Sequence, residues 1–281
     1  MRRCVLYACV LHITCPALRP YLHKLSSTSR RQTTTDPAKT PWPSRTHRYF
    51  LTTPPQFNDG RELALLRHIF SLPTLSTLRH NPSAICATMD HFAAHHDFLI
   101  NIGPDKAASV ASLITSHAPG VIVELGGYVG YSAIWFASAQ LSAWEAAGSK
   151  GEKPRYWSLE ADPVFAAVAM ALVDLAGLGD VVRVVVGNAD ESLRRLKQEG
   201  MVGEEEVDML FLDHVEELYD VDLKVAWEEL GLLRKGALVV ADNVLKPGAP
   251  RYREFVRGHE GLSTRVIKGL IIPGDAEVSN G

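Results

Sequence analysis

One stretch of the sequence decides the fold, residues 121–133, which run Val-Ile-Val-Glu-Leu-Gly-Gly-Tyr-Val-Gly-Tyr-Ser-Ala. Its β-branched start ends in Glu124, and Gly126 and Gly130 bracket a tight turn before an apolar helical pattern begins at Tyr131. This order predicts a strand, a glycine turn and a helix. In an open parallel sheet, ligands bind at such a junction because the glycines allow close backbone approach and the helix offers free N–H groups. We therefore expect a cofactor at this turn.

The spacing of the glycines indicates which cofactor. A dinucleotide fingerprint has the form G-x-G-x-x-G, whereas this turn is E-L-G-G-Y-V-G, with Glu124 two residues before Gly126. A carboxylate there would repel a diphosphate and attract a cation, and S-adenosylmethionine carries both a sulfonium and an ammonium group. The pattern therefore favours S-adenosylmethionine over NAD. The structural alternative is a turn that only packs the helix against the strand.

Strand and helix patterns alternate along the rest of the chain. Three helical patterns precede the turn, at residues 61–70, 81–95 and 107–116. After the first strand, four more strands are predicted at 156–159, 181–186, 207–212 and 237–240, with helices at 132–144, 163–176, 191–199 and 222–233. Five strands that alternate with helices predict an α/β architecture, a mostly parallel sheet with helices on both faces.

Residues 1–55 differ in composition from the rest of the chain. No acidic residue precedes Asp36, and a Ser/Thr-rich run with two arginines occupies residues 26–35. This composition is typical of an organelle transit peptide. One alternative is a secretory signal with its apolar core at residues 4–15. Another is a disordered tail that carries no targeting signal. We treat residues 1–55 as a disordered or targeting leader. We expect a cytoplasmic protein, or a mitochondrial one if residues 1–35 act as a transit peptide.

Global composition excludes several classes of function. The chain is 46% hydrophobic with a net charge of −3, which fits one large domain plus a tail. Lysines and arginines are interspersed with acids outside the leader, so no nucleic-acid partner is expected. The apolar part of the leader is too short and too polar to span a bilayer, so we expect no stable membrane anchor. The cysteines form no C-x-x-C motif, which argues against a zinc site or a disulfide framework; they are Cys4, Cys9, Cys15 and Cys86.

Polar residues follow every strand of the predicted sheet, at the edge where ligands bind. They are Glu124, Glu160, Asn188 with Asp190, Asp213, and Asp242 with Asn243. An acid after the second strand accepts hydrogen bonds from ribose hydroxyls in nucleotide-binding α/β folds, which predicts this role for Glu160. The alternative is a solvated acid before the helix-capping pair Asp162-Pro163.

A second cluster combines Asp213 with Asp242 and Asn243. Two carboxylates and an amide oxygen from neighbouring strand ends are hard oxygen ligands, which suit Mg²⁺ and leave positions for water and substrate. Taken alone, the pair Asp242-Asn243 is equally compatible with an ordinary turn before Pro247-Gly248. Together with Asp213, the pattern predicts a magnesium site.

These blocks resemble the catechol O-methyltransferase family, in the same order and with near-family spacing. The blocks are residues 124–133, 213–214, 231–236, 241–244 and 247–250, and the resemblance spans residues 59–255. It implies a Rossmann-like class I methyltransferase fold for residues 56–281. It further implies S-adenosylmethionine, Mg²⁺ and methyl transfer to one hydroxyl of a catechol or similar vicinal diphenol.

The resemblance also assigns roles by position. It implies that the metal ligands are Asp213, Asp242 and Asn243. It implies that the cofactor is bound by Asn101, Gly103, Glu124, Gly126, Tyr128, Ser132, Glu160, Asn188, Ala189 and Asp213.

The chain departs from the family in two places. Glu216 stands where the family has a lysine that serves as general base, and Val215 replaces a substrate-facing tryptophan. We expect the catalytic base to be Glu216, if burial raises its pKa, or Lys246 in the loop after Asn243. The tail is also short, and Glu277 is a candidate for the family glutamate that binds the second catechol hydroxyl.

Three rivals remain beside a magnesium-dependent catechol O-methyltransferase. One is another small-molecule O-methyltransferase that acts on a different phenol. A second is a cofactor-binding homologue with weak or no catalysis, motivated by the lost lysine and the short tail. A nicotinamide dehydrogenase is third, and the glycine spacing speaks against it. Fold alone does not separate these, because one architecture hosts many chemistries.

Overall fold

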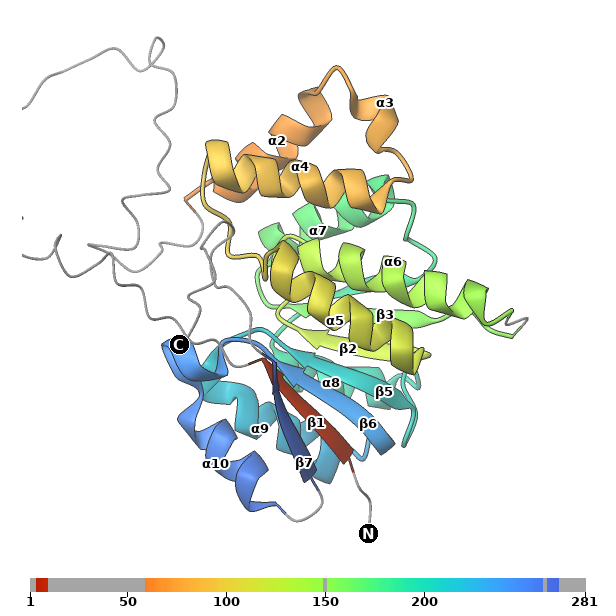
Figure 1. Ribbon diagram of the computed structural model, residues 1–281, viewed down its shortest axis with the longest axis vertical. Helices are drawn as coiled ribbons and strands as arrows, with labels where there is room; N and C mark the ends of the chain where they lie inside the picture. The colour runs from red at the N-terminus through yellow and green to blue at the C-terminus, as the bar shows by residue number, and fades with distance from the viewer. Residues whose placement is uncertain (1–3, 10–58, 149–150, 260–261, 268–281) are drawn as a thin grey trace, which may run out of the picture.

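The computed structural model describes residues 4–9, 59–148, 151–259 and 262–267 of the 281-residue chain. At its centre lies a seven-stranded sheet in the order β4-β3-β2-β5-β6-β1-β7, with every pair of neighbouring strands parallel (Figure 1). The strands are β1 (Cys4–Cys9), β2 (Val121–Leu125), β3 (Arg155–Glu160), β4 (Val182–Val186), β5 (Val207–Leu212), β6 (Leu233–Ala241) and β7 (Leu262–Ile267). The five predicted strands are β2 to β6, and they alternate with helices as expected.

Helices cover both faces of the sheet, and each face has its own apolar core. Helices α5 (Pro104–His117), α6 (Tyr131–Ala146) and α7 (Pro163–Leu175) cover one face. Outside them lie α2 (Arg61–Ser71), α3 (Leu75–Leu78) and α4 (Pro82–His95). The other face is covered by α8 (Ala189–Gln198), α9 (Tyr219–Lys224) and α10 (Pro250–Gly258), as Figure 1 shows. Within the described residues, no helix is both long and apolar enough to cross a membrane.

Local chemistry sets where these helices begin. Asn81 caps α4 by accepting a hydrogen bond from the Ala84 N–H, directly before Pro82. Asp162 caps α7 in the same way, ahead of Pro163. Both caps use an acceptor side chain followed by proline, which the sequence shows without tertiary information.

The segment between β5 and β6 differs from the prediction of one helix at 222–233. It folds as the 3₁₀ turn η3 (Glu216–Leu218), the helix α9 and the π-helical turn η4 (Val225–Glu229). Gly231 then adopts a left-handed conformation with φ of +62°, which ends the helical path. Strand β6 therefore begins at Leu233, four residues earlier than predicted.

Strand β1 lies in a region that we expected to stand outside the fold. Cys4–Cys9 pairs in parallel with both β6 and β7. The run Cys-Val-Leu-Tyr-Ala-Cys has the length and apolar character of a buried strand, so it can complete a sheet as well as serve as the core of a leader. The rest of the predicted leader, residues 10–55, lies outside the described residues.

Candidate active site

The glycine turn after β2 passes tightly over the ends of two neighbouring strands. Gly126 has a φ of +94°, and a Cβ atom there would collide with the backbone carbonyl of Asp213 at the end of β5. The Gly126 N–H donates to the carbonyl of Leu159 in β3 at 2.9 Å. A side chain at Gly127 would collide with the Ser158 hydroxyl. Only glycines allow this approach, so the predicted cofactor turn sits directly above the β3 and β5 ends.

Glu124 lies beneath this turn and is fully buried. Its carboxylate accepts hydrogen bonds from the hydroxyls of Ser132 and Ser158, the latter at 2.6 Å. Burial raises the pKa of Glu124 to about 7, and the two hydroxyls partly oppose this shift. Glu124, which the sequence places near a cationic ligand, is therefore buried, and a cation bound nearby would favour its ionised form.

Glu160 is pinned at the end of β3 by two backbone donors. Its Oε2 accepts from the Tyr128 N–H at 2.7 Å and its Oε1 from the Asp162 N–H at 2.8 Å. Burial raises its pKa. A carboxylate has about four acceptor positions, so these backbone donors leave room for a further donor. The alternative of a solvated acid is wrong, because Glu160 is buried, whereas Asp162 caps α7 with its own side chain as the pair Asp162-Pro163 indicates.

A narrow cleft opens beside the turn. It is lined by Ile100, Asn101, Ile102, Gly126, Gly127, Tyr128, Tyr131, Ser132 and Asp213. The side-chain nitrogen of Asn101 is buried without a hydrogen-bond partner in the described structure. An orphaned amide donor that lines a cleft is suited to a ligand acceptor such as a carboxylate. Gly103 is the residue before α5, with a φ of +79°, and it does not line the cleft.

Five of the ten predicted cofactor residues line this cleft: Asn101, Gly126, Tyr128, Ser132 and Asp213. Asn188 and Ala189 instead lie at the start of α8, after β4, and do not line it. Asn188 makes a long 3.4 Å hydrogen bond to Glu191. Since β4 is the next strand beyond β3 and the Gly187 N–H donates to the Glu160 carbonyl, this pair lies beside Glu160 at the same edge of the sheet.

The predicted metal ligands follow two neighbouring strands in register. Leu212 of β5 pairs with Ala241 of β6, so Asp213 and Asp242 leave the sheet side by side. Asp242 is 1% exposed, and the backbone of Asn243 turns sharply with a φ of +55°. Burial and the adjacent Asp242 raise the pKa of Asp213 well above its ordinary range, while Lys106 opposes the shift. The tertiary structure thus places Asp213 and Asp242 at adjacent strand ends, while no group of three or more His, Cys, Asp or Glu side chains in the described residues is arranged to hold a metal ion.

Two buried residues near the cleft were not predicted from the sequence. Lys106, in the first turn of α5, forms an ion pair of 2.5 Å with Asp242 Oδ2. Glu62 of α2 accepts a hydrogen bond of 2.7 Å from the Tyr128 hydroxyl. Both partners are remote in sequence, and nothing in the local patterns around Lys106 or Glu62 separates them from surface residues of an amphipathic helix.

The structure describes the surroundings of Glu216, one of the two candidate bases. Burial raises the pKa of the half-buried Glu216, with further contributions from the charges of Glu217 and Asp242. The neighbouring Val215 is 55% exposed, so the surface next to Glu216 is open to solvent at this position. The side chain of Lys246 and all of Glu277 lie outside the part of the chain that the structure describes.

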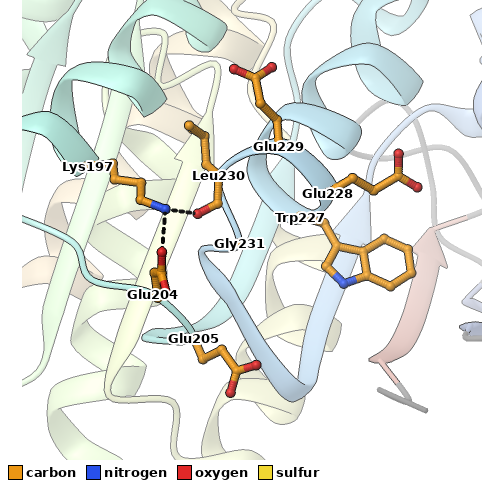
Figure 2. Close-up of a pocket in the computed structure, with 8 residues that line it drawn as sticks. All are labelled: Lys197, Glu204, Glu205, Trp227, Glu228, Glu229, Leu230 and Gly231. Carbon is orange, nitrogen blue, oxygen red and sulfur yellow. Dashed lines mark hydrogen bonds and ion pairs between the residues drawn. The ribbon is translucent and has the colours of Figure 1, made fainter.

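A larger cavity, of about 360 Å³, lies near the amino ends of β5 and β6, and Figure 2 shows the residues that line it. It is lined by Lys197, Glu204, Glu205, Trp227, Glu228, Glu229, Leu230 and Gly231. These residues precede or follow the amino ends of β5 and β6, and Lys197 binds Glu204 and the Leu230 carbonyl. The cavity therefore lies away from the carboxyl edge, and its size does not make it the active site.

Comparisons with known proteins agree with this geometry. A family model described as a methyltransferase domain matches residues 123–244. Catechol O-methyltransferase of Bos taurus is 33% identical over 232 residues, covering 76% of this chain and 79% of that protein. A probable O-methyltransferase of Mycobacterium tuberculosis is 33% identical over 220 residues, covering 78% and 88%. The O-methyltransferase from Bacillus cereus in complex with SAH has a TM-score of 0.50 at 21% identity, covering 70% of this chain and 85% of that chain.

The structural likeness confirms the predicted class I methyltransferase fold, and the sequence relatives confirm the family resemblance. The methyltransferase-domain match includes β2, the glycine turn and both strand ends that carry Asp213 and Asp242. The chain therefore belongs to the catechol O-methyltransferase-like family and is an S-adenosylmethionine-dependent O-methyltransferase.

Proposed function

We propose that this enzyme transfers the methyl group of S-adenosylmethionine to one hydroxyl of a catechol or similar vicinal diphenol, and that the reaction requires Mg²⁺. The single observation that carries this proposal is the register of β5 and β6, which sets Asp213 and Asp242 side by side next to the cofactor cleft. Relatives named catechol O-methyltransferase support the substrate class.

The residues present fit a divalent cation of the hard type. Asp213, Asp242 and Asn243 offer two carboxylates and an amide oxygen, which is the donor chemistry of Mg²⁺ rather than of zinc. Asp213 also lines the cleft, so a cation held there faces the methyl donor. Asp213, Asp242 and Asn243 would hold Mg²⁺, and the ion would supply the Lewis-acid chemistry that lowers the pKa of the attacking hydroxyl.

The groups around the cleft have the chemistry to bind S-adenosylmethionine. The orphaned Asn101 donor suits the carboxylate of the methionine end, and Glu124 beneath the turn favours its cationic groups. Glu160 has acceptor positions left for the ribose hydroxyls. These residues bind and orient the donor, and orientation in a near-attack geometry supplies a large part of the acceleration in such reactions.

We assign the proton-accepting role to Glu216 ahead of Lys246. A carboxylate is a weak base for a phenol unless its pKa is raised, and burial raises the pKa of Glu216 in this structure. The exposed Val215 and Leu218 extend from the same segment, 55% and 44% exposed. They form an apolar rim that suits the non-reacting side of an aromatic substrate.

Methyl transfer from labelled S-adenosylmethionine to a panel of catechols and single-hydroxyl phenols tests the proposal, with Mg²⁺ and with excess chelator. We expect turnover of catechols that the chelator abolishes, and a loss of more than about 100-fold in Asp213→Ala. Glu216→Gln should lower kcat and remove the acidic limb of the pH–rate profile, while Lys246→Ala should retain the rate. Glu204→Gln, in the larger cavity, serves as the control.

Each alternative has its own signature in the same assay. Turnover that persists in chelator would exclude the metal-dependent mechanism. Methylation of single-hydroxyl phenols alone would replace the catechol with another phenolic substrate. Cofactor binding without any turnover would favour a homologue that has lost catalysis. A rate lost in Lys246→Ala and kept in Glu216→Gln would reverse the assignment of the base.

A further inference from the structure

A buried lysine lies directly behind the proposed metal ligands. Lys106 is 3% exposed, and its ammonium group contacts Asp242 Oδ2 at 2.5 Å. The other oxygen of that carboxylate, Oδ1, accepts the Asn243 N–H at 2.8 Å. Lys106 belongs to α5 and Asp242 to the end of β6, so the pair joins a covering helix to the sheet.

Fully buried lysines are rare, because an ammonium group loses its hydration on burial and needs a charged partner to offset that loss. The partner here is one of two adjacent carboxylates. Asp213 and Asp242 place two carboxyl groups side by side in a poorly hydrated site, where ionisation of both groups is unfavourable unless a cation is near. Lys106 contributes one positive charge, so the cluster of Lys106, Asp213 and Asp242 has a net charge of −1 when all three groups are ionised.

We propose that Lys106 is an internal counter-ion that keeps the carboxylate pair assembled in the absence of metal, at the expense of divalent-cation affinity. The inference rests on the proposed function, because it takes Asp213 and Asp242 as the metal ligands. Lys106 does not touch the cofactor cleft, so its role is exerted through Asp242 and not on the substrate.

The sign of the effect on metal affinity follows from a thermodynamic cycle. Removing the ammonium charge leaves a buried carboxylate without its partner in the metal-free protein, which is strongly destabilising. In the metal-bound protein the divalent ion neutralises the same carboxylates, so the loss is smaller. The variant therefore gains metal affinity. A residue that merely held Asp242 in its correct orientation would have the opposite effect, a loss of about 10- to 100-fold in metal affinity.

The test measures Mn²⁺ binding to the full-length protein by electron paramagnetic resonance of the free ion, together with thermal unfolding with and without Mn²⁺. Mn²⁺ is a suitable probe because carboxylate and carbonyl oxygens also bind it. In Lys106→Met we expect Mn²⁺ to bind about tenfold more tightly or better. We expect the metal-free melting temperature to fall by roughly 10 °C, and saturating Mn²⁺ to restore most of that loss.

Two further variants separate charge from packing. In the double variant Lys106→Met, Asp242→Asn, the orphaned carboxylate is gone, so we expect the metal-free melting temperature to return close to the wild-type value. Lys153→Met removes an exposed lysine whose pair with Asp180 is solvated, and it should change neither quantity. The double variant also keeps the test interpretable if the single variant does not fold without metal.

The outcomes distinguish this inference from the proposed function. A wild-type protein that binds no Mn²⁺ would refute the metal site itself. A wild-type protein that binds Mn²⁺, beside a Lys106→Met variant that binds it equally or more weakly, would overturn the counter-ion role alone. A double variant as unstable as the single one would also overturn it, because the loss would then come from packing.

Discussion

Single residues decide the shape of this active site through close backbone approach and through burial. Gly126 is the clearest case, because its left-handed conformation and the carbonyl of Asp213 leave no room for a side chain. Gly236 has a similar φ of +83° but open space around it. The first glycine is therefore required by a neighbouring strand, and the second only by the irregularity within β6 where its pairing with β5 shifts register.

Burial also sets the ionisation of Asp90 in α4. Burial raises its pKa to about 6 from an ordinary value of 3.8, while the Tyr131 hydroxyl, which donates to it at 3.1 Å, opposes the shift. A carboxyl group whose pKa is raised on folding stabilises the protein fully below its unfolded pKa. That contribution is lost as the pH rises through about 6. Above that pH, the ionised Asp90 lowers the stability of the fold.

We therefore predict that Asp90→Asn stabilises the protein at pH 8. Since Asp90 is only partly buried, solvent screening reduces the gain to about 1 kcal/mol, or a rise of about 2–4 °C in melting temperature. The difference from wild type should shrink as the pH is lowered to 4. Thermal unfolding across this pH range measures it, with the exposed Asp180→Asn as control. A stabilisation that does not depend on pH would contradict the explanation.

At the scale of elements, helix α2 is tied to the active site through its first turn. The Tyr128 hydroxyl in the glycine turn donates to Glu62, and Arg61 donates to the Phe98 carbonyl at 2.8 Å in the segment that leads to the cleft. Both residues of α2 are buried. The helix therefore acts as a brace for the two loops that line the cleft, although it supplies no residue to the lining itself.

We predict that Tyr128→Phe weakens S-adenosylmethionine binding by about fivefold, because one buried hydrogen bond contributes about 1 kcal/mol. Glu62→Gln should have a smaller effect, since an amide oxygen still accepts the bond. Isothermal titration of the cofactor measures both, and a double-mutant cycle isolates the pair. If the two effects add without coupling, the brace does not act through this bond.

At the scale of the whole molecule, the carboxyl edge of the sheet gathers the proposed site from segments that are distant in sequence. The cleft is lined by the residues before α5, by the glycine turn after β2 and by Asp213 after β5. Asp242 follows the neighbouring strand β6. Strands β1 and β7 lie beyond β6 and contribute none of these residues. The proposed site is thus built on β2 to β6 and their helices.

Deletion of residues 1–55 should accordingly leave S-adenosylmethionine affinity and methyl transfer within about twofold of the full chain. Cofactor titration and the labelled-methyl assay measure the two quantities. A large loss of activity would show that β1 supports the site through β6. We also propose a cytoplasmic location for the enzyme. A fluorescent protein fused to residues 1–35 that enters mitochondria would favour the transit-peptide alternative instead.

The sequence by itself determined the alternation of strands and helices, the glycine turn at Gly126 and the edge that carries the acids. These features depend on local periodicity, on turn chemistry and on the rule that parallel strands end at one edge. The pattern of acids also predicted a magnesium site at Asp213 and Asp242, and the family resemblance implied the same roles, which stay predictions. Prediction failed between η3 and β6, because left-handed Gly231 and a π-helical turn broke a pattern that looked continuous.

Only the tertiary structure decided which charges meet. Lys106 and Asp242 are 136 residues apart in the chain, and Glu62 and Tyr128 are 66 apart. The pairing of two buried groups depends on how α2 and α5 pack over the sheet, and no spacing in the sequence encodes that geometry. The physical reason is that periodicity specifies which face of an element is buried, whereas the partner of a buried charge is set by the three-dimensional arrangement of the elements.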